Sequence, residues 1–218
     1  MPLLKPRKKT SARVPKGPSR KDTILKEATG LFSSHGYEGT SMRMIARKSG
    51  VTEAAIYRHF PGKAQLYEEV IRAKARNHDI ARLQEDSPAS ESVEGILSRI
   101  ARHILQLAKN DPELMRLMFH NSLEQGAFAA LLFMEVRLPY IRFLAGELER
   151  RMETGEVRRV DPFITSRCFV GMVMDCALNI GVWTTISDSQ FEATDVICNN
   201  VPIFARGLLA EGGPDQGP

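Results

Sequence analysis

The sequence predicts an all-α protein, because apolar residues recur with the helical period along most of the chain and no strand pattern or hairpin turn interrupts them. The first such pattern begins at Asp22 and places one set of apolar side chains on a single face: Ile24, Leu25, Ala28, Leu31 and Phe32. A further pattern begins near Gly62. Later helices are expected at about 92–109, 112–124, 126–154, 162–186 and 189–210. The pattern over 126–154 contains Pro139, and we expect a bend there because proline lacks the amide hydrogen that a helix interior uses.

Charge is distributed unevenly along the chain, although the formal net charge of the 218 residues is only +4. Residues 1–21 contain eight lysines and arginines and no acidic residue, whereas residues 75–218 contain fourteen basic and twenty acidic residues. The basic end also mixes prolines, glycine and serines without an apolar period, so we expect residues 1–20 to be a disordered arm suited to a polyanion. A disordered tail is expected at 211–218.

Several functional classes are disfavoured by what the sequence lacks. It contains no phosphate loop, nucleophile elbow, HExxH motif or dinucleotide fingerprint, so we expect no enzyme and no cofactor. His103 and His120 are isolated, and the three cysteines form no CxxC motif, so no metal site is expected. The cysteines lie in apolar surroundings and are expected to be core residues of a protein in a reducing cytoplasm.

Neither a secretory signal nor a membrane span is expected. The basic N-terminus is not followed by an apolar run. The most apolar stretch, residues 163–186, carries Arg167 and Asp175, and both would be costly in lipid. This stretch is expected to be a buried helix, and the protein to be cytoplasmic.

The stretch TSMRMIARKSGVTEAAIYRHFPGK, residues 40–63, predicts two short helices joined at Gly50. Thr40 or Ser41 can cap the first helix, and Thr52 can cap the second. The glycine supplies a turn with positive φ, and Ala46 is small enough for a close helix crossing. With Ile56 and Phe60 toward the core, the side chains of the second helix that must point largely outward are Thr52, Ala54, Tyr57 and Arg58. This is the arrangement of a helix-turn-helix.

The outward side chains of the second helix suit the major groove of DNA. Small Ala54, with Ala55, lets the backbone approach, while Tyr57 and His59 can donate to phosphates. Arg58 can reach a phosphate or a base edge, and Lys63 lies in the first turn of the following helix, which also favours phosphate. The alternative interpretation is that Tyr57 and His59 are ordinary helix-packing residues.

The span LFSSHGYEGTSMRMIARKSGVTEAAIYRHFPGKAQLYEEVI resembles the DNA-binding head of the TetR family of bacterial transcriptional regulators (TetR/AcrR-like). The resemblance implies a homodimer, usually a repressor, whose larger C-terminal domain binds a small ligand. It adds Thr40 and Arg43 as DNA contacts. We therefore expect a helix-turn-helix domain over 21–68 and a helical ligand-binding and dimerisation domain over 69–210. The expected DNA-binding residues are Thr40, Arg43, Thr52, Glu53, Ala54, Tyr57, Arg58, His59 and Lys63.

The C-terminal half contains flexible apolar residues that can line a pocket for a lipophilic ligand. Asp175 and Asn179, four residues apart on an otherwise apolar helix, could bind its polar end. The expected ligand-binding residues are Met115, Met118, Phe119, Phe133, Met172, Asp175, Asn179 and Trp183. The alternative is that most of these residues are only core residues, and that the two polar ones have a structural role.

The last two helices, 162–186 and 189–210, carry apolar residues on more than one face. We expect them to pair across a two-fold axis as a four-helix bundle, with Val201 and Phe204 pointing outward. Together these features predict a dimeric regulator that binds a palindromic operator and is released by a small lipophilic ligand. The alternative function is a sequence-independent architectural DNA-binding protein, which the basic arm would suit.

Overall fold

A computed structural model of the chain describes residues 19–76, 80, 83, 90–122, 126–183 and 191–210. The described residues are mainly helical and contain no β-strand, only an isolated bridge between Val157 and Leu209. The helices that form the head are α1 (Arg20–His35), α2 (Met42–Ser49), α3 (Glu53–Tyr57) and α4 (Lys63–Arg76). Those that follow are α6 (Val93–Asn110), α7 (Pro112–Ser122), α8 (Ala127–Leu132), the π-helix η1 (Phe133–Arg137), α9 (Leu138–Glu153), α10 (Pro162–Gly181) and α11 (Ala193–Leu208). The all-α prediction is confirmed.

The helix-turn-helix is built from local backbone chemistry. The Ser41 hydroxyl accepts a hydrogen bond from the amide of Met44 (3.2 Å), so Ser41 rather than Thr40 caps α2. Gly50 ends α2 with φ 66°, a left-handed conformation that is costly for residues with a Cβ. The Thr52 hydroxyl then accepts from the amide of Ala55 (3.2 Å) and starts α3. The two predicted short helices therefore form where the caps and the glycine place them.

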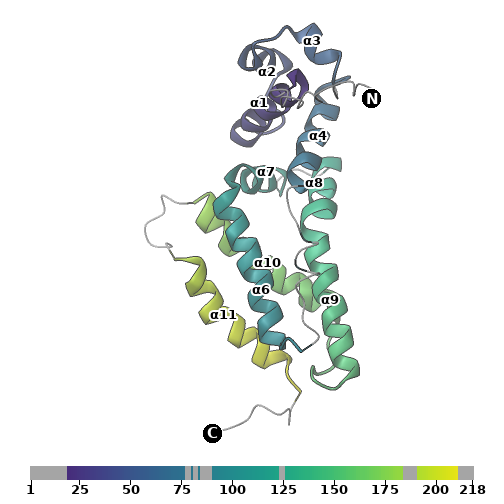
Figure 1. Ribbon diagram of the computed structural model, residues 1–218, viewed down its shortest axis with the longest axis vertical. Coiled ribbons are helices and arrows are strands. Elements are labelled where there is room, and N and C mark those ends of the chain that lie inside the picture. Colours follow the sequence, from purple (N-terminus) through teal and green to yellow (C-terminus); the bar gives the residue numbers. More distant parts are fainter. Residues whose placement is uncertain are drawn as a thin grey trace, which may run out of the picture.

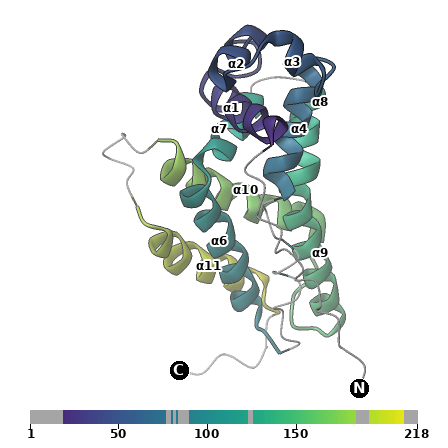
Figure 2. The same cartoon turned by 45° about the horizontal axis from the view of Figure 1, so that its top comes forward.

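The core of the head continues into the rest of the molecule. One apolar cluster includes Phe32 of α1, Ile45 of α2 and Ile56 of α3, together with Leu114 of α7 and Val136 of η1. In Figure 1 the head lies at one end, with α7 and α8 directly beneath it, and Figure 2 shows α1, α2 and α3 capping that end. The expected domain boundary after residue 68 falls inside α4, so the division into 21–68 and 69–210 stays a prediction. Residues 1–18 of the expected arm and the expected tail lie outside the described residues.

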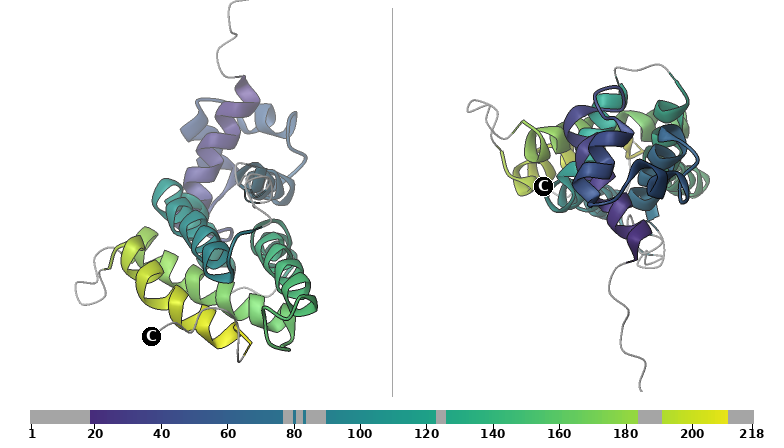
Figure 3. Two further views of the ribbon diagram at one scale, coloured as in Figure 1. Left: turned by 60° about the horizontal axis from the view of Figure 1, so that its bottom comes forward. Right: turned by 90° about the horizontal axis from the view of Figure 1, so that it is seen from above.

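A second apolar cluster forms the C-terminal bundle. In it α6 packs against α10 and α11, and α10 packs against α9; Figure 3 shows α10 and α11 running side by side. By length and composition α10 would also pass as a membrane-crossing helix. However, Phe169, Val170 and Val173 of α10 are fully buried in the bundle, as expected for a core helix of a globular domain.

The expected helix over 126–154 is divided into α8, η1 and α9. Five residues, Phe133–Arg137, adopt π-helical geometry directly before α9, whose second residue is Pro139. Proline cannot donate the amide hydrogen bond that an α-helix would direct to the carbonyl four residues earlier, which disfavours a regular α-helical ladder at this point. The sequence thus located the irregularity, and the structure shows that it is a change of hydrogen-bond register.

Other expectations need correction. The helix expected to reach residue 186 ends at Gly181, and the last helix begins at Ala193 rather than 189. Cys168 and Cys198 are exposed on α10 and α11, so they are not the core thiols expected from their apolar neighbours. An amphipathic helix places apolar neighbours along the sequence on opposite faces, and therefore neighbours alone do not indicate burial.

Candidate nucleic-acid interface and small-molecule cavity

The short helix α3 separates buried from exposed side chains sharply. Ala55, Ile56 and Phe60 are buried at 9%, 0% and 2% exposure, and they anchor the helix to the head. Ala55 therefore belongs to the anchor, whereas Ala54 lies on the outer surface. The exposed residues are Thr52, Glu53, Ala54, Tyr57, Arg58 and His59. Thr52, Ala54, Tyr57 and Arg58 are thus exposed as the sequence predicted.

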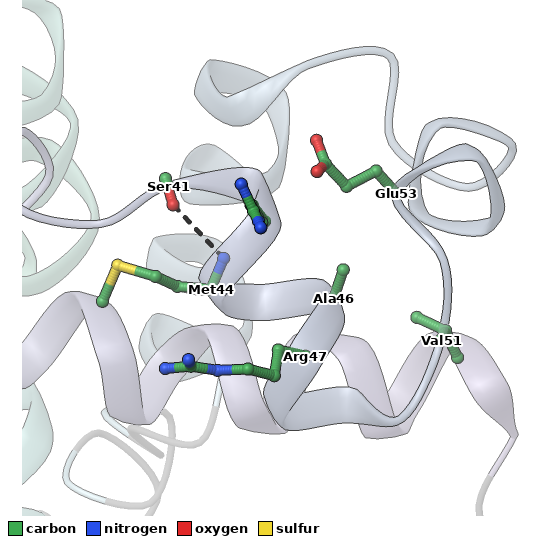
Figure 4. Close-up of a pocket in the computed structure, with 7 residues that line it drawn as sticks. Ser41, Met44, Ala46, Arg47, Val51 and Glu53 are labelled. Carbon is green, nitrogen blue, oxygen red and sulfur yellow. Dashed lines mark hydrogen bonds between the residues drawn. The ribbon is translucent and has the colours of Figure 1, made fainter.

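A groove of about 480 Å³ lies between α2 and α3, and Figure 4 shows Glu53 extending toward α2, which carries Met44, Ala46 and Arg47. Arg43 and Arg47 both line it and are exposed. Among the described residues neither forms an ion pair, so both guanidinium groups are available to an anionic partner. Arg43 was expected from the sequence, but Arg47 was not.

A second groove, of about 350 Å³, separates the start of α1 from α3. Arg58 and His59 line it on one side and Arg20 on the other. Arg20 had been assigned to the disordered arm, yet it is the first residue of α1 and directly follows its cap, Ser19. The Ser19–Asp22 capping box was the signal in the sequence that could have placed Arg20 on the helix.

Lys63 and Thr40 occupy different environments. The Lys63 ammonium lies 4.2 Å from the centre of the Tyr37 ring, an aromatic platform that holds the cation at the start of α4. Thr40, in contrast, is 1% exposed, and its hydroxyl donates to the carbonyls of Leu31 (3.2 Å) and Gly36 (2.9 Å). The expectation that the Thr40 side chain contacts DNA is therefore corrected, because the hydroxyl is buried and satisfied inside the head.

A cavity of about 180 Å³ lies where α7, η1 and α10 meet. It is lined by Met115, Met118, Phe119, Arg137, Gly171, Met174, Asp175 and Leu178. Ligand pockets are usually larger, about 300–1,000 Å³, so this conformation has room for a small ligand only. Four of the eight expected ligand-binding residues are among the lining, whereas Arg137 was not among the residues expected there.

The other four expected residues lie outside this lining. The Trp183 ring packs edge-on against Phe119, with 5.7 Å between ring centres, so it is one shell away from the cavity. The Arg167 guanidinium covers the ring of Phe133 at 5.1 Å. Met172 packs against the bundle core, and the Asn179 amide donates to the carbonyl of Asp175 (3.4 Å). These contacts are compatible with the alternative given above, in which the four residues have a structural role.

The sequence of the head matches a known family. Residues 24–70 match the family model of the bacterial regulatory proteins of the tetR family. The head is therefore a tetR-family head. The matched segment contains α2, α3 and both grooves described above, and it ends within α4.

Proteins similar to this chain carry different names. The nucleoid occlusion factor SlmA of Aliivibrio fischeri is 29% identical over 169 residues, which are 73% of this chain and 82% of SlmA. The transcriptional regulator AcrR of Shigella flexneri is 31% identical over 111 residues, which are 50% of this chain and 52% of AcrR. The crystal structure of AibR in complex with isovaleryl coenzyme A and operator DNA has a TM-score of 0.66 at 24% identity. That match covers 85% of this chain and 97% of AibR, and it shows that the fold is shared.

Proposed function

We propose that the chain is a dimeric, ligand-responsive transcriptional regulator, a repressor that binds a palindromic operator and is released by a small effector. The observation that carries the proposal is the exposed surface around α3, which presents Tyr57, Arg58 and His59. Arg43 and Arg47 line the groove on one side of α3, and Arg58 and His59 line the groove on the other. A short, firmly anchored helix of this kind can enter the major groove while flanking cations bind phosphates. AibR, which has this fold, was solved with operator DNA.

The cavity is placed to influence the head. Of its lining helices, α7 also packs against α1, and η1 also packs against α4. The side-chain amide of Asn121 on α7 donates to the Tyr67 hydroxyl of α4 (2.5 Å) in a buried contact. An effector that moves α7 or η1 would therefore change the position of the head through packed helices. Lower operator affinity follows if the effector binds the displaced state more tightly.

An ion cluster strengthens the same connection. The Lys74 ammonium donates to the carboxylates of Asp111 and Glu113, at 2.7 Å each, and so joins the end of α4 to the start of α7. Burial alone would lower the pKa of Lys74, but these hydrogen bonds raise the pKa above its ordinary value. Lys74 therefore stays charged at neutral pH, and the connection between head and bundle persists.

The dimer surface is proposed on α10 and α11. Ile164 of α10 and Ile203 of α11 are 59% and 66% exposed, which is unusual for large apolar side chains and typical of an interface. Val201 was expected to point outward, but it is 1% exposed and belongs to the core of the protomer. Phe204 is half-buried, with its ring centre 5.0 Å from that of Phe169. Ile203 is therefore the residue of α11 that best probes the interface.

Selection of bound fragments from genomic DNA, followed by footprinting, tests the proposal. The expected result is protection of a two-fold symmetric site whose half-sites are about one helical turn or a multiple apart. The second candidate function, sequence-independent binding, is favoured by the basic arm and by the similarity to a nucleoid occlusion factor. Uniform coating of DNA would support that function and contradict ours.

Single substitutions should separate base readout from phosphate binding. Arg43→Ala is expected to relax preference at one base position, at a cost of about 1–3 kcal/mol there. Tyr57→Ala and Lys63→Ala should instead weaken binding to all sequences, because each removes a group that binds a phosphate. Binding of each variant to operator and to random DNA measures the difference. An equal reduction on both DNAs for Arg43→Ala would show that Arg43 does not read a base.

The basic arm should act through counterion release. Deleting residues 1–18 removes six basic groups but keeps the Ser19 cap and Arg20 of α1, and it should flatten the dependence of log K on log salt by about 0.9 for each phosphate that the protein no longer neutralises. We expect only a few phosphates to be affected, because the basic groups of the arm need not all contact DNA at once. Titrations over a range of salt concentrations give the slope. An unchanged slope would show that the arm does not bind DNA.

The proposal assigns no catalytic activity to the chain and places it in the cytoplasm, where it has access to DNA. Among the described residues no group of three or more His, Cys, Asp or Glu side chains is arranged to hold a metal ion. Turnover of an effector candidate by the purified protein would contradict the first assignment.

A further inference from the structure

Arg137 is the unusual residue of the cavity. Its Nε atom is fully buried and has no hydrogen-bond partner. No carboxylate of the described residues forms an ion pair with its guanidinium, although Asp175 lines the same cavity. Arg137 as a whole is partly buried. A partly desolvated charge without a partner is unfavourable, and an arginine cannot escape by losing its proton at neutral pH. Among the described residues, the Arg137 guanidinium therefore has no counterion.

The surroundings of Arg137 make its charged form less favourable. Burial is the main cause that lowers the pKa of the Arg137 guanidinium, and the positive charge of Arg167 adds to it. Arg167 itself lies over the ring of Phe133, on the same π-helix that carries Arg137. Irregular π-turns of this kind often occur at functional sites. Arg167 is exposed and does not line the cavity, so Arg137 is the cation that faces it, and an anion bound there would offset both the repulsion from Arg167 and the cost of desolvating Arg137.

Apart from Arg137 and Asp175, the lining of the cavity is apolar. Met115, Met118, Phe119, Met174 and Leu178 supply most of its wall. Gly171 leaves room beside the guanidinium, since a Cβ there would lie 3.9 Å from Nη2. The volume of about 180 Å³ compares with the roughly 150 Å³ of a protein cavity that holds benzene. The space therefore fits an apolar group of about ring size with one charged end.

We infer that the cavity binds a small amphipathic anion, whose oxyanion is held by Arg137 and whose apolar body lies among the methionines and Phe119. The planar guanidinium presents paired N–H donors that match a carboxylate or a phosphate ester in geometry and charge. Asp175 disfavours a second negative charge and can accept a hydrogen bond from a donor on the ligand. This inference rests on the proposed effector pocket and makes its ligand an anion with an apolar body rather than a neutral lipophile.

Three probes with one phenyl group test the charge requirement: 3-phenylpropionate, phenyl phosphate and the uncharged 3-phenylpropanol. Trp183 is the only tryptophan of the chain and contacts Phe119, so its fluorescence reports binding in the cavity. Hydrogen bonds to a charged group typically contribute about 1.5–3 kcal/mol, so wild-type protein should bind an anionic probe at least about tenfold more tightly than the alcohol. Which anion binds better distinguishes a carboxylate from a phosphate ligand.

Arg137→Met keeps the apolar stem and removes the charge, and it should abolish the preference for the anion. Arg142→Met, at an exposed arginine of α9, is the matched control and should keep the preference. Asp175→Asn should tighten binding of both anions, because it removes a negative charge from the wall. Since Arg137→Met also removes an unpaired, partly buried charge, its Tm should be no lower than that of the wild type.

Equal affinity of wild-type protein for the alcohol and both anions, or no binding of any probe, would overturn the inference. So would an anion preference that persists in Arg137→Met. DNA selection in the same preparations keeps the two proposals separate. If no operator is found, the regulatory function fails whatever the probes show; if an operator is found without an anion preference, only the identity of the ligand is wrong.

Discussion

Replacing Ile203 by glutamate is expected to give a folded protomer that no longer dimerises and loses most of its affinity for the operator. Ile203 is 66% exposed on α11, so the charge does not disturb the core of the protomer. In a dimer the introduced carboxylate would have to be buried against the partner without a counterion. A monomer carries one head, and the absence of the linked second head should weaken operator binding about 10²- to 10⁴-fold. Sedimentation and operator titration measure the two effects.

Thr194→Glu is the matched control, because Thr194 is an exposed polar residue on the opposite side of the same helix. An acidic residue near a helix N-terminus is also favourable, so this variant should stay dimeric and bind the operator normally. Val201→Glu is not a suitable test, since Val201 is buried and the charge would unfold the protomer. A stable dimer of the Ile203→Glu variant would place the interface elsewhere.

Replacing Phe32 by alanine should have the largest effect on stability. Phe32 is fully buried in the head, and its ring centre lies 4.6 Å from that of Tyr67 and 6.1 Å from that of Tyr37. The cluster continues to Phe128 of α8, whose ring centre is 4.8 Å from that of Tyr67. Removing a buried phenyl group costs about 3–5 kcal/mol. For a chain of this size the Tm should fall by roughly 6–20 °C.

Tyr57→Ala provides the contrast. Tyr57 is 50% exposed, so its removal should change the free energy of unfolding by no more than about 0.5 kcal/mol. The two variants should therefore separate, with Phe32→Ala impaired in thermal unfolding and Tyr57→Ala impaired in DNA binding at a normal Tm. A Tm for Phe32→Ala that stays within experimental error of the wild type would show that the aromatic cluster does not stabilise the head.

The helix-turn-helix was predictable because local interactions build it. Gly50 is required by a left-handed turn, Thr52 caps the following helix, and Ile56 and Phe60 anchor it. These positions are separated by a few residues only, so their spacing determines which side chains of α3 point outward. The same local reasoning located the irregularity before Pro139, since the missing amide hydrogen is a property of one residue.

The sequence by itself therefore determined the helical fold, the head and the exposed face of α3. Only the tertiary structure decided which apolar faces are covered: Val201 is buried while Ile203 is exposed, although both lie on one apolar helix. The tertiary structure also buries the Thr40 hydroxyl in the head, and it places Arg137 at the cavity without a counterion among the described residues. The physical reason is that helical periodicity identifies a face, whereas burial and charge pairing depend on which distant helix packs against it.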